Sequence, residues 1–335
     1  MKALLSQAAG GPETLVLADR PVPTAGRGEL LVKVLVCAIN YPDVLIIEDK
    51  YQFKPERPFA PGSEICAEVA AVGEGVEGWA PGDRLIAVTG HGGLSEYMLL
   101  PAAKAFALPH GRDPMEGAAL LMTYATTIHA LVDRGALAAG ETLLVLGAAG
   151  GVGLAAVEIG KAMGARVVAA VSSEEKAQAV RDAGADDVLI YGRAPFDKAQ
   201  SKALAQAFKD KVGPDGAHVI YDPVGGDYCD PALRAIAWEG RYLVVGFPAG
   251  IPHLPLNLTL LKSCDVRGVF WGGFAARYPD RNRAHVAQLF RWWEEGSIRP
   301  RIDRSWPLER AGEAIAWLAD RKAVGKMVVD LRQGA

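Results

Sequence analysis

The chain has 335 residues, of which 50% are hydrophobic and 22% are charged, and its formal net charge is −3 at neutral pH. This size and composition predict a soluble globular protein of about two domains with an ample apolar core. The weak negative charge, and the lack of a dense run of Lys or Arg, argue against a nucleic acid or an anionic membrane as partner.

The four cysteines are scattered and form no C-x-x-C pair, which is typical of reduced, buried thiols rather than of a disulfide framework. The first residues lack the apolar stretch of a signal peptide, and no uncharged apolar run reaches the roughly 18 to 20 residues of a membrane span. We therefore expect a cytoplasmic protein that does not enter the membrane.

Short strands and turns fill about the first 100 residues of the chain. The expected strands are Leu30–Val36, Ile65–Val72, Arg84–Val88 and Ser95–Leu100. Pro81-Gly82-Asp83 is a turn signal, because proline and glycine supply the backbone angles that tight turns need. This spacing predicts a β-rich, barrel-like unit.

From about residue 123 to residue 272, strand and helix patterns alternate, which predicts a parallel sheet covered by helices. The expected strands are Leu143–Leu146, Val167–Val171, Asp187–Ile190, His218–Tyr221, Arg241–Val245 and Val266–Phe270. Such a set suits a complete doubly wound dinucleotide-binding fold.

Beyond residue 272 the chain returns to two amphipathic helices, Asp280–Ser297 and Leu308–Asp320, and a last strand, Met327–Leu331. We expect this tail to fold back onto the N-terminal unit. The predicted domains are therefore residues 1–122 with 273–335, and residues 123–272.

A glycine-rich turn joins the apolar run Glu141–Leu146 to a helical pattern. Its candidate cofactor contacts are Gly147, Ala149, Gly150, Gly151, Val152 and Gly153. Glycines at a strand-to-helix turn let the backbone approach a pyrophosphate, and the helix N-terminus offers N–H groups to phosphates. Strand, turn, helix and next strand follow in the right order, so we predict a bound dinucleotide. The alternative is a tight turn of purely structural role.

The second strand of this domain ends at Val171 without a carboxylate that could grip the ribose 2′-hydroxyl of NAD. The hydroxyls of Ser172 and Ser173 suit the 2′-phosphate of NADP(H) instead, as do Lys176 shortly after them and Tyr191 at the end of the next strand. We therefore expect NADPH as the cofactor. The alternative is local, because Ser172 and Glu175 have the spacing of a capping box at a helix start.

The six histidines show no pair at ligand spacing and the cysteines do not cluster, so we expect no zinc site. Neither a G-x-S-x-G elbow nor a G-x-x-x-x-G-K-[ST] loop is present, which argues against an α/β-hydrolase and a nucleotide hydrolase. Hydride transfer needs neither motif. In that reaction the cofactor supplies the chemistry, while the protein orients it and places a hydrogen-bond donor near the substrate oxygen.

Several motifs follow one another along nearly the whole chain. They are Cys37–Asp43, Pro61–Glu64, Pro81–Arg84, Thr126–Leu131, the glycine turn, Tyr221–Gly226 and Gly325–Val329. In this order they resemble the zinc-independent quinone oxidoreductase (zeta-crystallin-like) branch of the medium-chain dehydrogenase/reductase superfamily. The resemblance implies a GroES-like β-rich catalytic domain plus a Rossmann-type doubly wound parallel-sheet domain. It also implies NADPH as cofactor and a homodimer whose edge is the strand around Val266–Phe270.

Zinc alcohol dehydrogenases of the same superfamily place Cys where this chain has Asn40, His where it has Ser63, and a third ligand near Met122. Their cysteine-rich loop for a structural zinc is missing after Arg84. The resemblance therefore also implies a reductase that works without zinc.

The resemblance assigns roles to single residues as well. Asn40 lies where quinone reductases keep an Asn near the nicotinamide, and Thr126 matches a threonine that packs against the nicotinamide ring. Lys176 and Tyr191 match residues that hold the 2′-phosphate. The positions that flank the nicotinamide in the family are here Gly246, Phe247, Val269, Phe270 and Trp271. Asp222, after its strand, is expected to cap a turn rather than to act as a base.

Tyr51 has two possible roles. In enoyl thioester reductases of the superfamily a tyrosine near this position donates a proton to the substrate, and a reference pKa of about 10 keeps tyrosine protonated at neutral pH. Alternatively, Tyr51 only lines the cleft and stacks on a quinone. The chain departs from the family here, since Asp49-Lys50 precedes Tyr51 where glycine is frequent.

Three functions stay open. The first is an NADPH-dependent reductase that passes hydride to quinones or related conjugated (enone-like) carbonyls in a cleft between the two domains. The second is a 2-alkenal or enoyl thioester reductase with Tyr51 as proton donor. The third is a non-catalytic NADPH-binding protein, either structural or redox-sensing. No motif encodes the physiological substrate.

Overall fold

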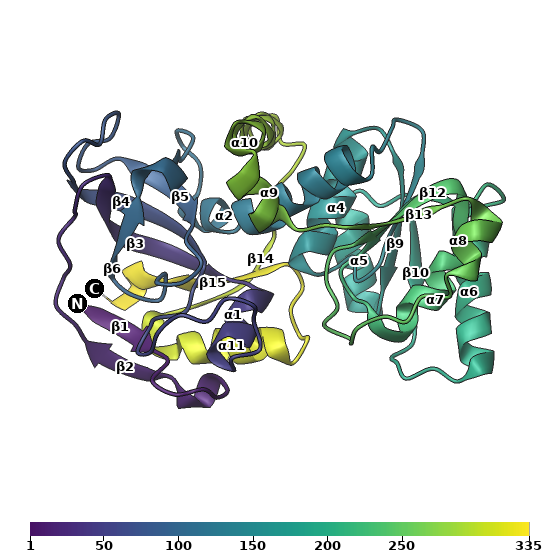
Figure 1. Ribbon diagram of the computed structural model, residues 1–335, viewed down its shortest axis with the longest axis horizontal. Helices are drawn as coiled ribbons and strands as arrows, with labels where there is room; N and C mark the ends of the chain where they lie inside the picture. The colour runs from purple at the N-terminus through teal and green to yellow at the C-terminus, as the bar shows by residue number, and fades with distance from the viewer. Residues whose placement is uncertain (335) are drawn as a thin grey trace. The chain divides into compact units, whose positions relative to one another are not determined.

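The computed structural model describes residues 1–334. The chain divides into two units, of which the first comprises residues 1–122 together with the chain from residue 300 onward, and the second comprises residues 123–299. Each unit has its own sheet, as Figure 1 shows, and its own apolar core.

The first unit is built on a sheet in the order β14-β15-β3-β4-β5-β7, with β6 also pairing with β3. These strands are β3 (Glu29–Ile39), β4 (Glu64–Val72), β5 (Arg84–Val88), β6 (Tyr97–Pro101), β7 (Phe106–Ala107), β14 (Ile302–Trp306) and β15 (Lys326–Asp330). A separate antiparallel pair joins β1 (Lys2–Leu5) to β2 (Val16–Asp19). The four strands predicted for this region are confirmed, and the predicted β-rich, GroES-like architecture is confirmed with them.

Strand β3 is the centre of the first unit. Its first half alternates, with Leu30, Val32 and Val34 buried, as expected for a strand with one face on the core. From Leu35 to Ile39 every side chain is buried, and helix α2 (Pro114–Ala118) contacts this strand. The strand is therefore three residues longer at its C-terminal end than the alternation predicted, because its end is covered on both faces.

The tail of the chain returns to this sheet as expected. Strand β15 pairs antiparallel with β3, so that Met327 lies opposite Ile39 and Val329 lies opposite Cys37. Helix α11 (Ala311–Ala319) packs against helix α1 (Tyr41–Ile47), and its inner face contributes Ala311, Ala314 and Ile315 to the core. The end of the chain thus completes a sheet that its first hundred residues begin.

The second unit contains a parallel sheet in the order β10-β9-β8-β11-β12-β13. Its strands are β8 (Thr142–Val145), β9 (Arg166–Val171), β10 (Asp187–Ile190), β11 (Ala217–Asp222), β12 (Ile236–Val244) and β13 (Asp265–Gly268). In chain order this is 3-2-1-4-5-6, the doubly wound arrangement of dinucleotide-binding domains. The Rossmann-type prediction is confirmed.

Helices cover this sheet, which is why its central strands are apolar on both faces. They are α3 (Thr126–Ile128), α4 (Gly151–Ala162), α5 (Glu174–Asp182), α6 (Lys198–Val212), α7 (Cys229–Leu233) and α8 (Asn257–Lys262). Leu143 and Leu144 on β8, and Val167 and Val168 on β9, have no exposed surface. These buried runs are the pattern from which the sequence analysis placed the strands.

The second domain boundary differs from the sequence prediction. Residues 273–299 divide with the second unit, whereas the sequence analysis assigned them to the catalytic domain. Helices α9 (Trp271–Arg277) and α10 (Pro279–Glu294) carry the contacts responsible. The Phe274 ring stacks on His129 with centroids 4.0 Å apart, and Arg281 pairs with Asp133 at 2.6 Å. Both partners belong to the second unit, so these contacts hold the helix pair there.

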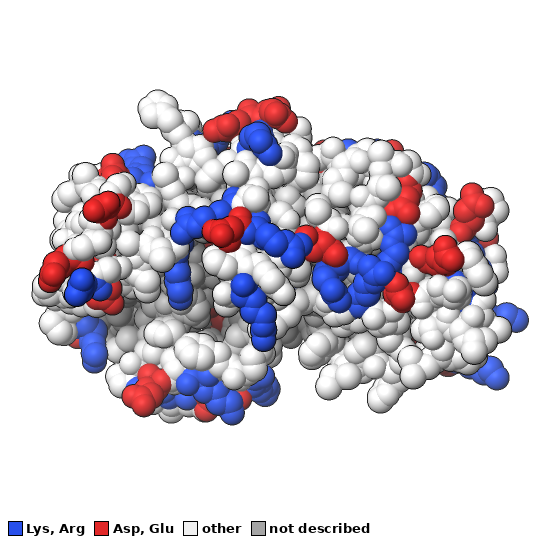
Figure 2. Space-filling view, turned by 45° about the horizontal axis from the view of Figure 1, so that its top comes forward, with Lys and Arg blue, Asp and Glu red and all other residues white. Residues whose placement is uncertain are grey.

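Surface charges of both signs are mixed, in line with the small net charge. Figure 2 shows Lys and Arg side chains interspersed with Asp and Glu side chains on one face of the molecule. Within residues 1–334, no helix combines the length and the apolar character that crossing a bilayer requires.

Candidate functional site

The glycine turn lies where the order of the parallel sheet reverses, between β8 and β11. Gly147 has φ +55°, a left-handed conformation that a side chain would strain. A Cβ on Gly153 would lie 2.4 Å from the carbonyl oxygen of Gly147 and 2.7 Å from the backbone of Ala148. At Gly150, in contrast, the nearest atom to an added Cβ would be 3.5 Å away. Gly147 provides the left-handed conformation of the turn, and Gly153 lets helix α4 pack closely against it. Gly150 keeps the approach to the N-terminus of α4 free of side-chain atoms.

The N-terminus of α4 fits a pyrophosphate. Gly150 is the N-cap residue and has no side chain that could accept a hydrogen bond from the first turn. The first N–H groups of an α-helix have no partner within the helix, and together with the helix dipole they favour an anion. The first turn of α4, at Gly151, Val152 and Gly153, therefore offers backbone N–H donors that could hold a dinucleotide phosphate.

The end of β9 carries hydroxyls rather than a carboxylate. The helix that follows is capped by Ser173, whose Oγ accepts a hydrogen bond from the Lys176 backbone N–H at 3.3 Å. The predicted capping box of Ser172 and Glu175 is thus wrong by one residue, because Ser173 is the residue that takes the extended N-cap conformation. Capping occupies Ser173 and does not involve the hydroxyl of Ser172, so the cap and a 2′-phosphate site do not compete for the same group.

The remaining predicted cofactor residues follow the carboxyl ends of other strands. Tyr191 comes after β10, Gly246 and Phe247 follow β12, and Val269 follows β13. Because all strands of this sheet are parallel, these segments reach the same edge as the glycine turn. Phe247 and Phe270 are 53% and 61% exposed, so both rings are available to a ligand. Trp271 begins α9, and its indole N–H donates to Asn282 at 2.9 Å.

Thr126 begins the short helix α3 in the same unit. The hydroxyl of its neighbour Thr127 donates to the Thr123 carbonyl at 2.8 Å, bonds with the Tyr221 hydroxyl at 2.9 Å and lies 3.4 Å from the Val152 carbonyl oxygen at the start of α4. Thr126 is therefore anchored close to the start of α4, the helix that fits the pyrophosphate.

Asp222, the last residue of β11, holds the turn that follows this strand. Its buried carboxylate accepts the backbone N–H groups of Val224 and Gly225 at 2.8 and 2.9 Å, so it caps the turn as expected. The other oxygen accepts from the Tyr242 hydroxyl at 2.7 Å and from the Cys229 thiol at 2.9 Å. These two partners could not be predicted from the sequence, because they lie 20 and 7 residues away on other elements.

Asn40 lies at the end of β3 in the first unit and is the N-cap of α1. Its backbone N–H donates to Asp43 at 2.8 Å, and the same carboxylate accepts from the Gly62 N–H at 3.1 Å and the Ser63 hydroxyl at 3.4 Å. Asp43 has no exposed surface. Burial raises the pKa of its carboxyl group to about 6, although these donors and Lys326 oppose the rise.

The side chain of Asn40 belongs to a buried cluster. Its Nδ2 donates to Glu64 Oε2 at 2.9 Å, its Oδ1 accepts from Lys326 Nζ, and Lys326 also donates to Glu64 Oε2 at 3.0 Å. The second oxygen of Glu64 accepts the backbone N–H of Met122 at 2.7 Å. Glu64 and Lys326 each lie in one of the sequence motifs, but the motifs by themselves do not reveal this partnership. A lysine in an otherwise apolar strand, Lys326–Val329, was the signal that could have found it.

Tyr51 follows helix α1 and packs, half-buried, against the apolar core of the first unit. Burial, and secondly the Asp43 carboxylate, raise the pKa of its hydroxyl, so Tyr51 stays protonated at neutral pH. Asp49 just before it has φ +57°, a left-handed conformation that Asp adopts more easily than most residues. Asp49 thus adopts a left-handed backbone conformation, which glycine adopts readily, in the segment where the family often has a glycine.

Two family models match the chain. The model described as alcohol dehydrogenase GroES-like domain matches residues 26–110, and the model described as zinc-binding dehydrogenase matches residues 151–289. A quinone oxidoreductase-like protein 2 homolog from Nematostella vectensis is 34% identical over 99% of this chain and 89% of its own length. The chain belongs to the medium-chain dehydrogenase/reductase superfamily, in its quinone oxidoreductase branch.

Solved structures of this branch agree with the fold. A mycobacterial protein solved in complex with NADPH has 30% sequence identity and a TM-score of 0.90, with 98% of this chain and 99% of the other covered. The Escherichia coli quinone oxidoreductase complexed with NADPH has 26% identity and a TM-score of 0.89, with 98% of this chain and 100% of the other covered. By family, this chain is an oxidoreductase.

The positions that hold zinc in the alcohol dehydrogenases of the superfamily carry poor zinc ligands here. Asn40 offers an amide already bonded to Glu64 and Lys326, Ser63 a hydroxyl bonded to Asp43, and Met122 a thioether. Zinc prefers thiolate, imidazole and carboxylate ligands. Among the side chains of residues 1–334, no group of three or more His, Cys, Asp or Glu is arranged to hold a metal ion. This donor set does not fit zinc.

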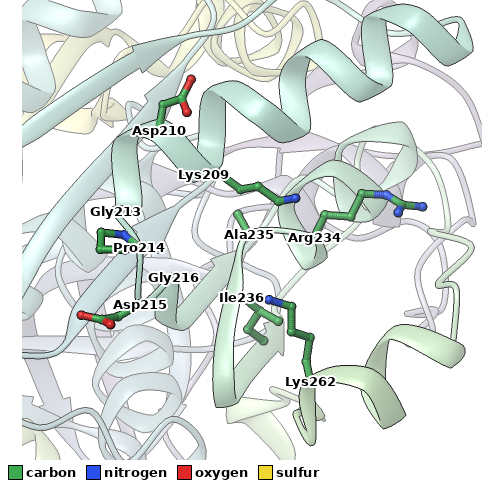
Figure 3. Close-up of a pocket in the computed structure, with 10 residues that line it drawn as sticks. All are labelled: Lys209, Asp210, Gly213, Pro214, Asp215, Gly216, Arg234, Ala235, Ile236 and Lys262. Atoms are coloured by element: carbon green, nitrogen blue, oxygen red, sulfur yellow. The ribbon is translucent and has the colours of Figure 1, made fainter.

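A cavity of about 530 Å³ opens at the amino ends of β11 and β12, which is the sheet edge opposite the glycine turn. Figure 3 shows the side chains of Lys209, Arg234 and Lys262 at this cavity, with the carboxylates of Asp210 and Asp215 pointing away from them. The three basic residues stand at the C-terminal ends of α6, α7 and α8, where cations balance the partial negative charge of a helix terminus. Helix electrostatics explain this cluster, and we assign the cavity no part in cofactor binding.

Proposed function

We propose that the chain is an NADPH-dependent reductase that transfers hydride to quinones or related conjugated carbonyls without zinc. The observation that carries this proposal is the edge of the parallel sheet at the glycine turn. There, the spacing of Gly147, Gly150 and Gly153 supports a pyrophosphate site, and the neighbouring strand β9 is followed by two serines and Lys176 instead of a carboxylate at its tip. NADPH, when bound, supplies the hydride.

Each part of the cofactor would contact a different segment of the second unit. Residues 147–153 would hold the pyrophosphate by their backbone N–H groups. Ser172, Lys176 and Tyr191 would hold the 2′-phosphate. The residues proposed to flank the nicotinamide are Thr126, Gly246, Phe247, Val269, Phe270 and Trp271.

The first unit would supply hydrogen-bond donors to the electron acceptor. A carbonyl oxygen gains negative charge as hydride arrives, and positioned donors stabilise that charge. Asn40 and Tyr51 are proposed for this role, because the first is an amide held in a fixed environment and the second is a hydroxyl that keeps its proton. Reduction of a quinone to a hydroquinone takes one hydride and one proton, and Tyr51 or water would supply the proton.

The first experiment is to follow NADPH oxidation with a panel that contains a naphthoquinone, 2-alkenals and a crotonyl thioester, with NADH in parallel. Quinone turnover with a strong preference for NADPH supports the proposal. Lys176→Ala should raise the KM for NADPH by roughly 10- to 100-fold, the value of one charge-assisted hydrogen bond, and leave the KM for NADH unchanged. The exposed Lys198→Ala is the matched control. Equal use of NADH and NADPH by the wild type would contradict the 2′-phosphate assignment.

The second candidate is a 2-alkenal or enoyl thioester reductase, which the protonated Tyr51 favours. Tyr51→Phe should then abolish turnover, because phenylalanine has no proton to donate, whereas a tyrosine that only stacks on the substrate tolerates the change. Turnover of the alkenals or the thioester alone would move the assignment to this activity. Tight NADPH binding with no turnover over the whole panel would instead indicate a non-catalytic binding protein.

We also propose a homodimer formed through the edge strand β13. This strand pairs only with β12 within the described chain, and an edge strand is a template for pairing with another copy. Large apolar residues in this region are between 61% and 79% exposed, namely Ile251, Leu256, Leu260, Leu261 and Phe270. Light scattering should give twice the mass of one chain, and Leu260→Asp should reduce the measured mass to that of one chain. A monomeric wild type contradicts the proposal.

A cytoplasmic location stays a prediction, supported by four buried cysteines that form no disulfide.

A further inference from the structure

Three ionisable side chains are almost completely buried together in the first unit. Asp43, Glu64 and Lys326 expose 0%, 1% and 3% of their surface. Lys326 is the first residue of β15 and Glu64 the first residue of β4, and both strands pair antiparallel with β3, which ends beside Asn40. Three strand ends therefore meet at one edge of the sheet, with the Asn40 carboxamide between an ammonium and a carboxylate.

The chemistry of the two partners determines how this carboxamide is oriented. A carboxylate only accepts hydrogen bonds and an ammonium only donates them. The Asn40 NH₂ group must therefore face Glu64, at 2.9 Å, and its oxygen must face Lys326. A flipped amide would place its oxygen against the carboxylate and its NH₂ group against the ammonium, so one orientation is strongly preferred.

This orientation leaves one N–H of Asn40 loosely held. Nδ2 has two hydrogens, of which one goes to Glu64 and the other points to the Ala38 carbonyl oxygen at 3.4 Å. That distance is long for an N–H···O bond, whose usual range is about 2.7 to 3.2 Å. The carboxamide is planar and held by Glu64 and Lys326, so the direction of this N–H is fixed, and a closer acceptor approaching along that direction would displace only the weak contact with the Ala38 carbonyl. In addition, the positive charge of Lys326 on the amide oxygen polarises the group and makes this N–H a better donor.

We propose that Glu64 and Lys326 are positioning residues that hold the Asn40 carboxamide with an N–H directed to the carbonyl oxygen of the electron acceptor. The inference deepens the proposed reductase function and rests on it for the identity of that acceptor. A role in stability alone is a poor explanation of the pair, because replacing a buried ion pair by apolar residues is often neutral or stabilising. The pair does fix a geometry that apolar side chains could not fix.

The orientation can be tested without any turnover. The chain has only three asparagines, Asn40, Asn257 and Asn282, so [¹⁵N]asparagine labelling gives three pairs of side-chain NH₂ signals, and Asn40→Ala identifies one of them. We expect the Asn40 pair to exchange slowly with water in the wild type. In Lys326→Met it should shift and exchange at least about 10-fold faster, and Lys326→Arg should restore much of the protection. Unchanged Asn40 signals in Lys326→Met would overturn the proposal. The signals of Asn257 and Asn282 are the internal control.

Kinetics then test whether the orientation matters for the reaction. Lys326→Met should lower kcat for the quinone by about 10- to 100-fold, the effect of a misplaced reacting group, and leave the KM for NADPH within about twofold. Lys322→Met, a change of the same kind at an exposed position of the same segment, should alter neither value. If Lys326 acts through Asn40, Asn40→Ala combined with Lys326→Met should be no slower than Asn40→Ala alone. Additive losses would overturn the inference.

A second variant covers the case in which Lys326→Met does not fold. Glu64→Gln keeps the size of the side chain but replaces one acceptor oxygen by an NH₂ group, so it weakens the preference for one amide orientation. Its Asn40 signals should then broaden or double, and unchanged signals would again overturn the inference. If the wild type reduces no quinone, the proposed function fails, while the NMR result still decides whether the pair holds Asn40.

Discussion

Replacing Gly153 by alanine should destabilise the second unit, whereas the same change at Gly150 should not. An added Cβ at Gly153 would lie 2.4 Å from the Gly147 carbonyl oxygen, and ordinary contact begins at 3.4 Å, so the glycine turn and helix α4 must separate by about 1 Å. The opposing atoms are backbone and have no rotamer that moves them aside. Overpacking of this kind costs about 1 to 3 kcal/mol, and we expect the upper end. At about 2 to 4 °C per kcal/mol, Tm should fall by roughly 6 to 12 °C.

Gly150→Ala is the matched control for this experiment. Its added Cβ meets no atom closer than 3.5 Å, and its φ of −76° suits alanine. A Gly-to-Ala change at an N-cap costs about 1 kcal/mol or less, so Tm should fall by no more than about 4 °C. The methyl group would however occupy the approach to the helix N-terminus, and the Kd for NADPH should rise at least about 10-fold. Thermal melting without cofactor and a fluorescence titration with NADPH measure the two effects. Equal destabilisation by both variants, or NADPH binding unchanged in Gly150→Ala, would refute the division of roles between the two glycines.

Three further predictions concern buried groups and the edge strand. The raised pKa of Asp43 means that the folded protein favours the protonated carboxyl, so its stabilising effect is present below pH 3.8 and is lost as pH rises to about 6. Between pH 4 and pH 7 the unfolding free energy of the wild type should therefore fall by about 3 kcal/mol relative to that of Asp43→Asn, which has no carboxyl group to titrate at this position. If the unfolding free energies of the two proteins changed equally with pH, this prediction would be contradicted. Asp222→Asn should weaken NADPH binding more than Cys229→Ser does, because only the carboxylate holds the turn at Val224, as calorimetric titration of both variants would check. Val266→Lys on β13 should lower the mass measured by light scattering to that of one chain, and an unchanged dimer would move the interface elsewhere.

The parallel sheet could be predicted from the sequence because its central strands bury both faces. Runs such as Val167–Val171 are apolar throughout, and each is followed by a turn and an amphipathic helix, so local pattern alone placed the strands within one or two residues, apart from the early start of β12 at Ile236. The glycine turn was visible for the same reason, since every residue of it is contiguous in the sequence. Its function depends on the backbone, and glycine spacing reports backbone geometry directly.

Features that depend on distant contacts could not be predicted in this way. The amphipathic pattern of α10 shows that one face is buried but not which unit buries it, and its true partners, Asp133 among them, lie almost 150 residues earlier. The cap at Ser173 rather than Ser172 depends on which serine takes the extended conformation, and adjacent hydroxyls give no sequence signal for that choice. The bond between Asn40 and Lys326 spans 286 residues and follows only from the register of β15 on β3.

The two units differ in the kind of group that each would contribute to the proposed reaction. The second unit would bind its ligand mainly through backbone N–H groups and space, which many side-chain changes leave intact. The first unit would act through side chains whose orientation depends on neighbours from three separate strands. Substitutions in the second unit should therefore appear first in NADPH affinity, and substitutions around Asn40 first in kcat. A variant of Glu64 or Lys326 that changed only NADPH affinity would contradict this separation, because neither residue belongs to the unit proposed to hold the cofactor.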